Sequence, residues 1–409
     1  MGWIFRTDHT RNGQIEGIRS SRQADAYNRK QSRIGEKSAG QILADACRWK
    51  GNVLYQGSFP VMPAHQSRDL RPELLHQIVT NACSGAPAIL IYSDEEAAIR
   101  SIFSQCTDCM DVRIRGDHLL DGLPVETLLT SFMGSPDDMR TELRMYLEQV
   151  IEYQAAHGGA VTPEAVAELL CRPGPMLQEA PAPRQDGSFD FMAVGANQRE
   201  QMARMLRMLC EEWPDQEMEC GGSATGLSFY GAVRSGKAVS CYCSWNMPQT
   251  WKILSGTLQR LDREQVPFSL IFDQPPVWKL PSLLAAVNRH PVFLRVDQTP
   301  GLCTAGGEDA SRVFQNTVSH FDICILSQVG DGAELWSEHL GKYDRVLQSN
   351  NSTKGLFFDM RMLPGFRRDR SRTYSVAPDF RLQPNELRGL CGDTGKLVVC
   401  QRGEAVIYR

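Results

Sequence analysis

The chain has 409 residues, of which 42% are hydrophobic and 22% are charged, so its composition is that of a folded protein with one large or two ordinary domains. The formal net charge of -4 gives no chain-wide signal for nucleic-acid binding. No apolar run reaches about 18 residues, so the sequence predicts no membrane span. The 13 cysteines are an odd number with no signal peptide before them, and we expect reduced thiols in a cytoplasmic protein.

The amino-terminal part of the chain changes character after its first 38 residues. Residues 1–38 are polar, basic and weakly periodic, which predicts a flexible arm. Over residues 39–116 the pattern alternates between strand and helix. It predicts a strand at 52–62, a helix at 70–83 and a strand at 88–92. This succession is typical of a parallel α/β sheet, so 39–116 is expected to form the first part of an α/β domain.

A helical pattern interrupts the α/β pattern between residues 117 and 215. We expect 117–215 to be an inserted helical module, and 216–409 to be the second part of the α/β domain. Two apolar runs in this second part, at 268–272 and 292–296, are typical of fully buried parallel strands. The sequence predicts that they lie beside the strand at 88–92 in one mainly parallel sheet.

Polar side chains follow these two apolar runs, where each strand is expected to end. The first run ends in Asp273-Gln274 and the second is followed by Asp297-Gln298. Asp273 stands where a nucleotide-hydrolysing fold has the aspartate that holds Mg²⁺, and Gln274 stands where a catalytic glutamate would follow. Gln298 could contact a γ-phosphate from the adjacent strand. The alternatives are a turn aspartate before Pro275 and, for Gln298, a surface turn.

One segment matches the spacing of a phosphate-binding loop. Residues 231–237 follow the pattern G-x4-G-K, with Gly236 and Lys237 as candidate phosphate ligands. Ala238 stands where the motif needs a hydroxyl to ligate Mg²⁺. A phosphate-binding loop leads into a helix, whereas 239–243 predicts a strand. A hairpin turn that uses Gly236 explains the same letters equally well.

The loop at 63–69 lies where a phosphate-binding loop is expected, after the first strand and before the first helix of the sheet. Its candidate nucleotide ligands are Ser67, Arg68 and Asp69. It contains no glycine and no lysine, and without glycine the backbone amides close less readily around phosphates. It is either a phosphate-binding loop that has lost its phosphate-binding residues or a loop that merely connects a strand to a helix.

Two further residue groups carry recognisable chemistry. Cys106 and Cys109 form a lone CxxC, and because zinc needs four ligands and no second pair stands at finger spacing, we expect no metal site. A basic stretch near the carboxyl end is expected to be a loop that could contact DNA phosphates; it contains Arg367, Arg368, Arg370 and Arg372. The alternatives are a solvated loop, or arginines paired with acids on a neighbouring subunit.

The order of these parts resembles a known family, the coupling-protein ATPases of conjugation and type IV secretion of the TraG/TraD type. The resemblance is strongest over residues 262–409. It rests on the strand-end pair Asp273-Gln274, on Gln298, and on a series of segments in matching order: Lys279-Leu280-Pro281, Phe314–Leu326, Ala333–Gly341 and Arg381–Leu387. No single motif decides it, and before residue 120 the match concerns topology alone.

The resemblance implies an α/β fold of the RecA-like P-loop NTPase type, with a mainly parallel sheet and an inserted helical module. It also implies ATP and Mg²⁺ as candidate cofactors. Secretion or conjugation proteins, DNA and further copies of the chain are the candidate partners it implies. The chain departs from the family in having no intact phosphate-binding loop, no glutamate beside Asp273 and no amino-terminal membrane anchor.

These departures predict a hydrolysis-impaired component of a DNA-transfer or type IV secretion apparatus that acts by binding and assembly. Two alternatives stay open at the level of the sequence. One is an active ATPase of the same superfamily that drives DNA or protein translocation, with its phosphate loop at 231–237. The other is a stand-alone scaffold or regulatory protein that uses no nucleotide.

Overall fold

The structure is a computed structural model, and it divides into two compact units. One unit comprises residues 40–325, and the other comprises the residues up to 39 together with 326–409. The parts of the chain that the structure describes are 21–58, 70–93, 98–113, 141–157, 163–174, 194–211, 229–244, 248–276, 280–302, 308–358, 364–391, 396–401 and 404–409.

The larger unit is built on a mainly parallel sheet. Its strands lie in the order β8-β2-β7-β6-β3-β5-β4, and every neighbouring pair from β2 to β4 is parallel. The strands are β2 (Val53–Gln56), β3 (Ala88–Tyr92), β4 (Cys109–Arg113), β5 (Ala238–Tyr242), β6 (Ser269–Asp273), β7 (Val292–Val296) and β8 (Ile323–Leu326).

The three central strands confirm the sheet that the sequence predicts. β7, β6 and β3 lie side by side, with Phe272 in register with both Leu294 and Ile91. All residues of these three strands are buried, which explains why their sequences are continuous apolar runs. The fold class predicted from the sequence is therefore confirmed.

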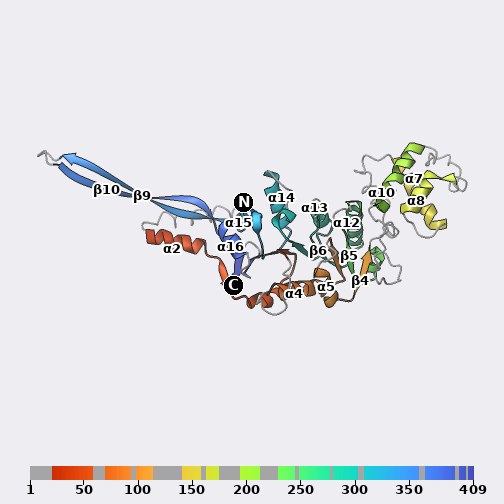
Figure 1. Cartoon of the computed structure of the whole chain (residues 1–409), viewed down its shortest axis with the longest axis horizontal. Coiled ribbons are helices and arrows are strands. Elements are labelled where there is room, and N and C mark those ends of the chain that lie inside the picture. Colours follow the sequence, from red (N-terminus) through yellow and green to blue (C-terminus); the bar gives the residue numbers. More distant parts are fainter. Residues whose placement is uncertain are drawn as a thin grey trace, which may run out of the picture. The chain divides into compact units, whose positions relative to one another are not determined.

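Helices cover both faces of this sheet (Figure 1). Figure 1 shows α4 and α5 on one side of the strands and α12, α13 and α14 on the other. α4 buries Leu74, Leu75, Ile78 and Val79, a stripe at helical spacing. The helices of this unit that border the sheet strands in sequence are α3 (Gln41–Ala46), α4 (Arg71–Cys83), α5 (Ala98–Cys106), α11 (Phe229–Arg234), α12 (Pro248–Arg263), α13 (Leu280–Ala286), η3 (Thr299–Leu302) and α14 (Glu308–Val318).

The described elements between β4 and α11 are all helices. They are α7 (Thr141–His157), α8 (Pro163–Cys171) and α10 (Ala196–Glu211), and α8 packs against both of the others. The sequence predicts helices in these three places. The boundaries 117 and 215 of the predicted module lie outside the described residues, so those boundaries stay predictions.

The smaller unit combines three sheet strands with a long two-stranded ribbon. The strands β1 (Gly35–Lys37), β12 (Glu404–Tyr408) and β11 (Leu397–Gln401) lie in that order, with β1 parallel and β11 antiparallel to β12. The ribbon pairs β9 (Lys342–Phe358) with β10 (Pro364–Phe380) in antiparallel register. Its helices are α2 (Ser21–Gln31), η4 (Gly330–Gly332), α15 (Ala333–His339) and α16 (Pro384–Leu390).

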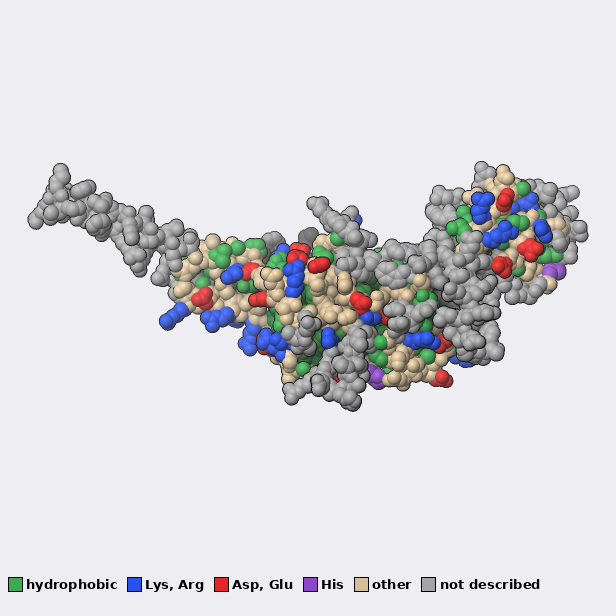
Figure 2. All heavy atoms as spheres, viewed as in Figure 1, with side chains coloured by type: hydrophobic (Ala, Val, Ile, Leu, Met, Phe, Trp, Pro, Cys, Tyr) green, Lys and Arg blue, Asp and Glu red, His purple; other side chains and the backbone are tan. Residues whose placement is uncertain are grey.

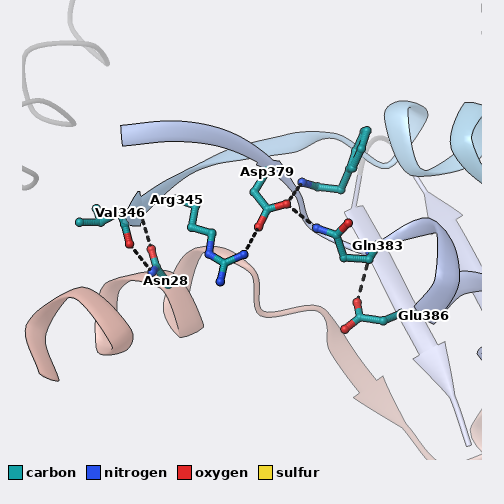
Figure 3. Close-up of polar contacts among 7 residues, drawn as sticks. Asn28, Arg345, Val346, Asp379, Gln383 and Glu386 are labelled. Carbon is teal, nitrogen blue, oxygen red and sulfur yellow. Dashed lines mark hydrogen bonds and ion pairs between the residues drawn. The ribbon is translucent and has the colours of Figure 1, made fainter. Parts of the chain in front are cut away.

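The predicted flexible arm over residues 1–38 is wrong for the part that the structure describes. Residues 21–31 form the helix α2, and residues 35–37 form the strand β1. The side-chain amide of Asn28 donates to the carbonyl of Val346 in β9 at 2.9 Å and accepts from its N–H at 2.9 Å (Figure 3). Contacts with residues more than three hundred positions away therefore order this polar segment, and periodicity within the segment could not reveal them.

A carboxylate at the foot of the ribbon ties β9, β10 and α16 together. Asp379 accepts hydrogen bonds from Arg345 of β9 at 2.9 Å, from its neighbour Phe380 at 3.0 Å and from the side chain of Gln383 (Figure 3). Gln383 also caps α16, where Glu386 completes a capping box. The ribbon is thus held at its base by a network that joins both strands to the following helix.

The arginine cluster lies in a strand, where the sequence analysis expected a loop. Arg367, Arg368, Arg370 and Arg372 belong to β10, opposite Gly355, Lys354, Ser352 and Asn350 of β9. The loop prediction was wrong because a two-stranded ribbon need not bury either face, so its sequence carries no apolar alternation. The side chains from 349 to 373 lie outside the described part. In the same unit, exposed basic side chains lie around α2 (Figure 2).

Candidate functional site at the carboxyl ends of the strands

The candidate site lies where β2, β7 and β6 end. These strands are neighbours and run parallel, so their carboxyl ends meet at one edge of the sheet, where ligands of open α/β sheets bind. β7 lies between the other two. The residues at its end therefore separate Asp273 of β6 from the segment that follows β2.

A buried arginine dominates this edge. Arg295 of β7 is in direct register with Asp273, and only 5% of its side chain is exposed. Its guanidinium forms ion pairs at 2.5 Å with Asp273, whose side chain is 1% exposed, and at 2.5 Å with Asp297, whose side chain is 37% exposed. One positive charge thus serves two carboxylates, and hydrogen bonding to a planar fork makes such pairs strong.

Gln274 takes part in the same cluster. Its side-chain amide donates to Asp297 at 2.7 Å, and its backbone N–H donates to the carbonyl of Arg295 at 2.9 Å. Ser93, just after β3, donates to the carbonyl of Gln274 at 2.7 Å. These contacts hold Gln274 at a φ of 52°, a left-handed conformation that side-chain-bearing residues rarely adopt. A glutamate here would bring a second negative charge against Asp297.

Gln298 is exposed in the turn after β7, where the sequence analysis placed a phosphate-sensing side chain. The buried polar contact at this part of the edge is made by Gln56 and Thr299, and Gln298 takes no part in it. Gln56, fully buried at the end of β2, donates to the hydroxyl of Thr299 at 2.9 Å. Sequence reasoning missed Gln56 and Arg295, although a lone arginine inside an apolar strand signals a buried partner.

The residues at Asp273 do not fit a Mg²⁺ site. Mg²⁺ binds hard oxygen ligands whose negative charge is available to the ion. Here the guanidinium of Arg295 occupies one oxygen of Asp273 and one of Asp297. A divalent cation bound here would be repelled by the positive charge of the buried Arg295, which already pairs with both carboxylates.

The G-x4-G-K segment forms the end of a helix. α11 ends at Arg234, Gly236 has a φ of +82°, and β5 begins at Ala238. The N–H of Gly236 donates to Val233 at 2.9 Å and that of Lys237 to Ala232 at 3.1 Å, the two bonds of a Schellman cap.

The backbone amides that a phosphate would need are therefore used to end α11. The order of elements is helix then strand, the reverse of a phosphate-binding loop, and it also differs from the predicted hairpin turn. The other candidate nucleotide ligands, Ser67, Arg68 and Asp69, lie outside the described residues.

Further observations on metal binding and membrane spans concern the described ranges. No group of three or more histidine, cysteine, aspartate or glutamate residues there could hold a metal ion. The ten cysteines that the structure describes are free thiols. Among the helices of the described ranges, none is long and apolar enough to cross a membrane.

Comparison with known proteins identifies the class of fold. No protein-family model and no curated protein sequence matches the chain. Solved structures do match, and they show that the fold is the RecA-like NTPase fold of conjugative coupling proteins.

Several of the similar structures are of the coupling protein TrwB. An unbound form of a truncated TrwB superimposes with a TM-score of 0.52 at 12% identity over 91% of each chain. TrwB in complex with a non-hydrolysable GTP analogue gives 0.50 at 14% identity, over 96% of this chain and 92% of that one. TrwB in complex with a non-hydrolysable ATP analogue gives 0.51 at 12% identity, over 92% of each chain. At these identities the likeness establishes the fold alone.

The Arg295 cluster makes a prediction about stability. Replacement of Arg295 by methionine removes the ion-pair partner of the buried Asp273, so we expect the free energy of unfolding to fall by about 3–5 kcal/mol. Urea denaturation followed by circular dichroism measures it. Arg172, which is highly exposed and lies 3.9 Å from Glu168, provides the matched control. Arg172→Met should cost less than about 1 kcal/mol, and equal losses in the two variants would contradict the buried pair.

Proposed function

We propose that the chain is a hydrolysis-impaired, coupling-protein-like component of a conjugative DNA-transfer or type IV secretion apparatus in the cytoplasm. It acts by binding and assembly, and it uses little or no ATP turnover. Its partners are proteins of the secretion or conjugation machinery, DNA and further copies of the chain. The observation that carries the loss of hydrolysis is the ion pair between Arg295 and the strand-end carboxylates.

The physical reason is that phosphoryl transfer depends on positioning and charge. A nucleotide-hydrolysing site uses an aspartate to hold Mg²⁺ and a further polar group to orient water. In this chain Asp273 is neutralised by Arg295, and the next residue is a glutamine whose amide is bonded to Asp297. Neither group is available for its catalytic role, which supports binding without efficient hydrolysis.

The comparison supports a nucleotide as a candidate ligand. TrwB structures contain analogues of GTP and ATP, and the likeness extends over nine-tenths of both chains. We propose ATP as the nucleotide that this chain would bind. Mg²⁺, which the family resemblance implies, does not fit the cluster as it stands.

The first functional prediction concerns ATP turnover. We expect the purified chain to hydrolyse ATP no faster than its Asp273→Ala and Asp273→Asn variants, because Asp273 holds no metal. Gln274→Glu should not raise the rate, since the new carboxylate faces Asp297. Phosphate release with Mg²⁺ and ATP, together with binding of a fluorescent ATP analogue, measures both steps.

The control for this prediction is Lys237→Ala, which removes the lysine of the G-x4-G-K segment. Lys237 contributes its backbone N–H to the cap of α11, and alanine keeps that group, so loss of the side chain should change neither binding nor turnover. Robust Mg²⁺-dependent hydrolysis that Lys237→Ala abolishes would contradict our proposal and favour the active ATPase.

We further propose that the distal part of the β9/β10 ribbon contacts DNA. Arg367, Arg368, Arg370 and Arg372 fall within six consecutive residues of β10, and Lys354 is in register with Arg368. A two-stranded ribbon is narrow enough to enter the major groove of DNA, and arginine forks bind phosphate oxygens. Such contacts give sequence-independent binding that weakens steeply with salt.

This proposal predicts a specific loss of affinity. Changing the four arginines together to alanine should weaken binding to duplex or single-stranded DNA by about tenfold or more at low salt, and flatten its salt dependence. Fluorescence anisotropy at two salt concentrations measures both. The matched control removes four exposed arginines from the other unit: Arg172, Arg204, Arg263 and Arg289. Equal binding by the ribbon variant and the parent, or no binding by either, would exclude the ribbon as a DNA contact.

A transfer assay tests the role in the apparatus. Deleting the gene should reduce plasmid transfer or secretion by its host, and the wild-type gene should restore it. If the chain acts by binding and assembly, the Asp273→Asn gene should restore transfer equally well, while the four-arginine ribbon variant should restore it poorly. Normal transfer after deletion would instead favour a scaffold or regulatory protein outside such an apparatus.

A further inference from the structure

Three cysteines lie close to one face of α4 in the larger unit. Cys83 is the last residue of α4, Cys106 is the last residue of α5, and Cys109 is the first residue of β4. His76, Thr80 and Cys83 follow one another at helical spacing, so they form one stripe of α4. All three cysteines are partly exposed, which leaves them accessible to small reagents.

Cys106 packs directly on this stripe. Its sulfur lies 3.3 Å from the hydroxyl of Thr80 and 3.9 Å from Nε2 of His76. Thr80 donates its own proton to the carbonyl of His76 at 2.8 Å, so towards Cys106 its oxygen acts as an acceptor. The thiol of Cys106 thus faces a hydroxyl oxygen that can accept a hydrogen bond from it and an imidazole nitrogen that can accept its proton.

Cys83 lies three residues beyond Thr80 on the stripe that Cys106 contacts, so it is placed to be the second thiol of a pair. Burial, followed by the neighbouring charges of Cys106 and Cys109, raises the pKa of the Cys83 thiol to about 12. Burial also raises the pKa of Cys109. Cys83 and Cys109 therefore stay protonated at neutral pH, while Cys106 is the thiol with a proton acceptor beside it.

We propose that Cys106 is an oxidant-sensitive thiol that forms a disulfide with Cys83 when the protein meets a hydroperoxide. The thiolate of Cys106 attacks the O–O bond, an S–O bond forms, and the departing oxygen takes the thiol proton and leaves as water or alcohol. The sulfur of Cys83 then attacks the sulfur of Cys106. The S–S bond forms, the S–O bond breaks, and the hydroxyl leaves as water with the proton of Cys83.

The bond would join the carboxyl ends of α4 and α5, which Figure 1 shows on the same side of the sheet. It would close a loop of chain that contains β3, the strand next to β6. Cross-links of this kind restrict the unfolded chain and stabilise the folded one. The oxidised protein should therefore unfold at a higher temperature than the reduced protein, and reduction should reverse the shift.

The test uses the full chain treated with hydrogen peroxide. A 1,3-dione reagent traps sulfenic acid, and differential alkylation with peptide mapping identifies bonded cysteines. We expect trapping at Cys106 to be roughly tenfold faster than at the exposed Cys47, and a Cys83–Cys106 bond that Cys106→Ser or Cys83→Ser abolishes. Cys47→Ser is the control that should leave the bond intact. Cys106→Ala is a second variant at the same position, which should also lack the bond if Cys106→Ser folds poorly.

Three results would overturn the inference. The first is a Cys106 that reacts no faster than Cys47 in the folded protein. The second is a disulfide from Cys106 to Cys109 or to another chain. The third is a stoichiometric zinc ion, lost in Cys106→Ser, that protects the three thiols from peroxide.

Discussion

The edge of the central sheet depends on one buried ion pair, between Arg295 and Asp273. A charged side chain inside a sheet is costly unless it is paired, and these two residues are in direct register on neighbouring strands. The same guanidinium reaches Asp297, and Asp297 in turn fixes Gln274. The polar residues at this edge of the sheet thus satisfy one another.

The Arg295 cluster bears on chemistry, whereas the comparison with solved structures bears on the fold. The fold is shared with the coupling protein TrwB, at an identity of 11–14%. A shared fold does not imply a shared chemistry, so the ion pairs at this edge support our proposal of binding without efficient hydrolysis.

The sequence predicted the central strands and the polar residues at their ends, because a buried parallel strand shows itself as an apolar run with an abrupt end. It could not predict that Arg295 would pair with Asp273, since a lone charge in such a run shows only that it needs a partner. Residues 231–237 match the pattern of a phosphate-binding loop but form a helix cap, because a glycine followed by a lysine is compatible with both structures. Residues 21–31 appeared unstructured because their partner strand lies at the other end of the chain.

The two hydrogen bonds between Asn28 and Val346 cover one position on the outer edge of strand β9. A strand edge with unpaired amides and carbonyls is a template on which other chains can stack, and two-stranded ribbons offer two such edges. An asparagine side chain carries one donor and one acceptor in the same arrangement as a peptide group, so Asn28 imitates a neighbouring strand at a single position. Leucine could not do so, and aspartate would lose the donor. The helix α2 therefore occupies one position on the edge of β9 that another strand would need.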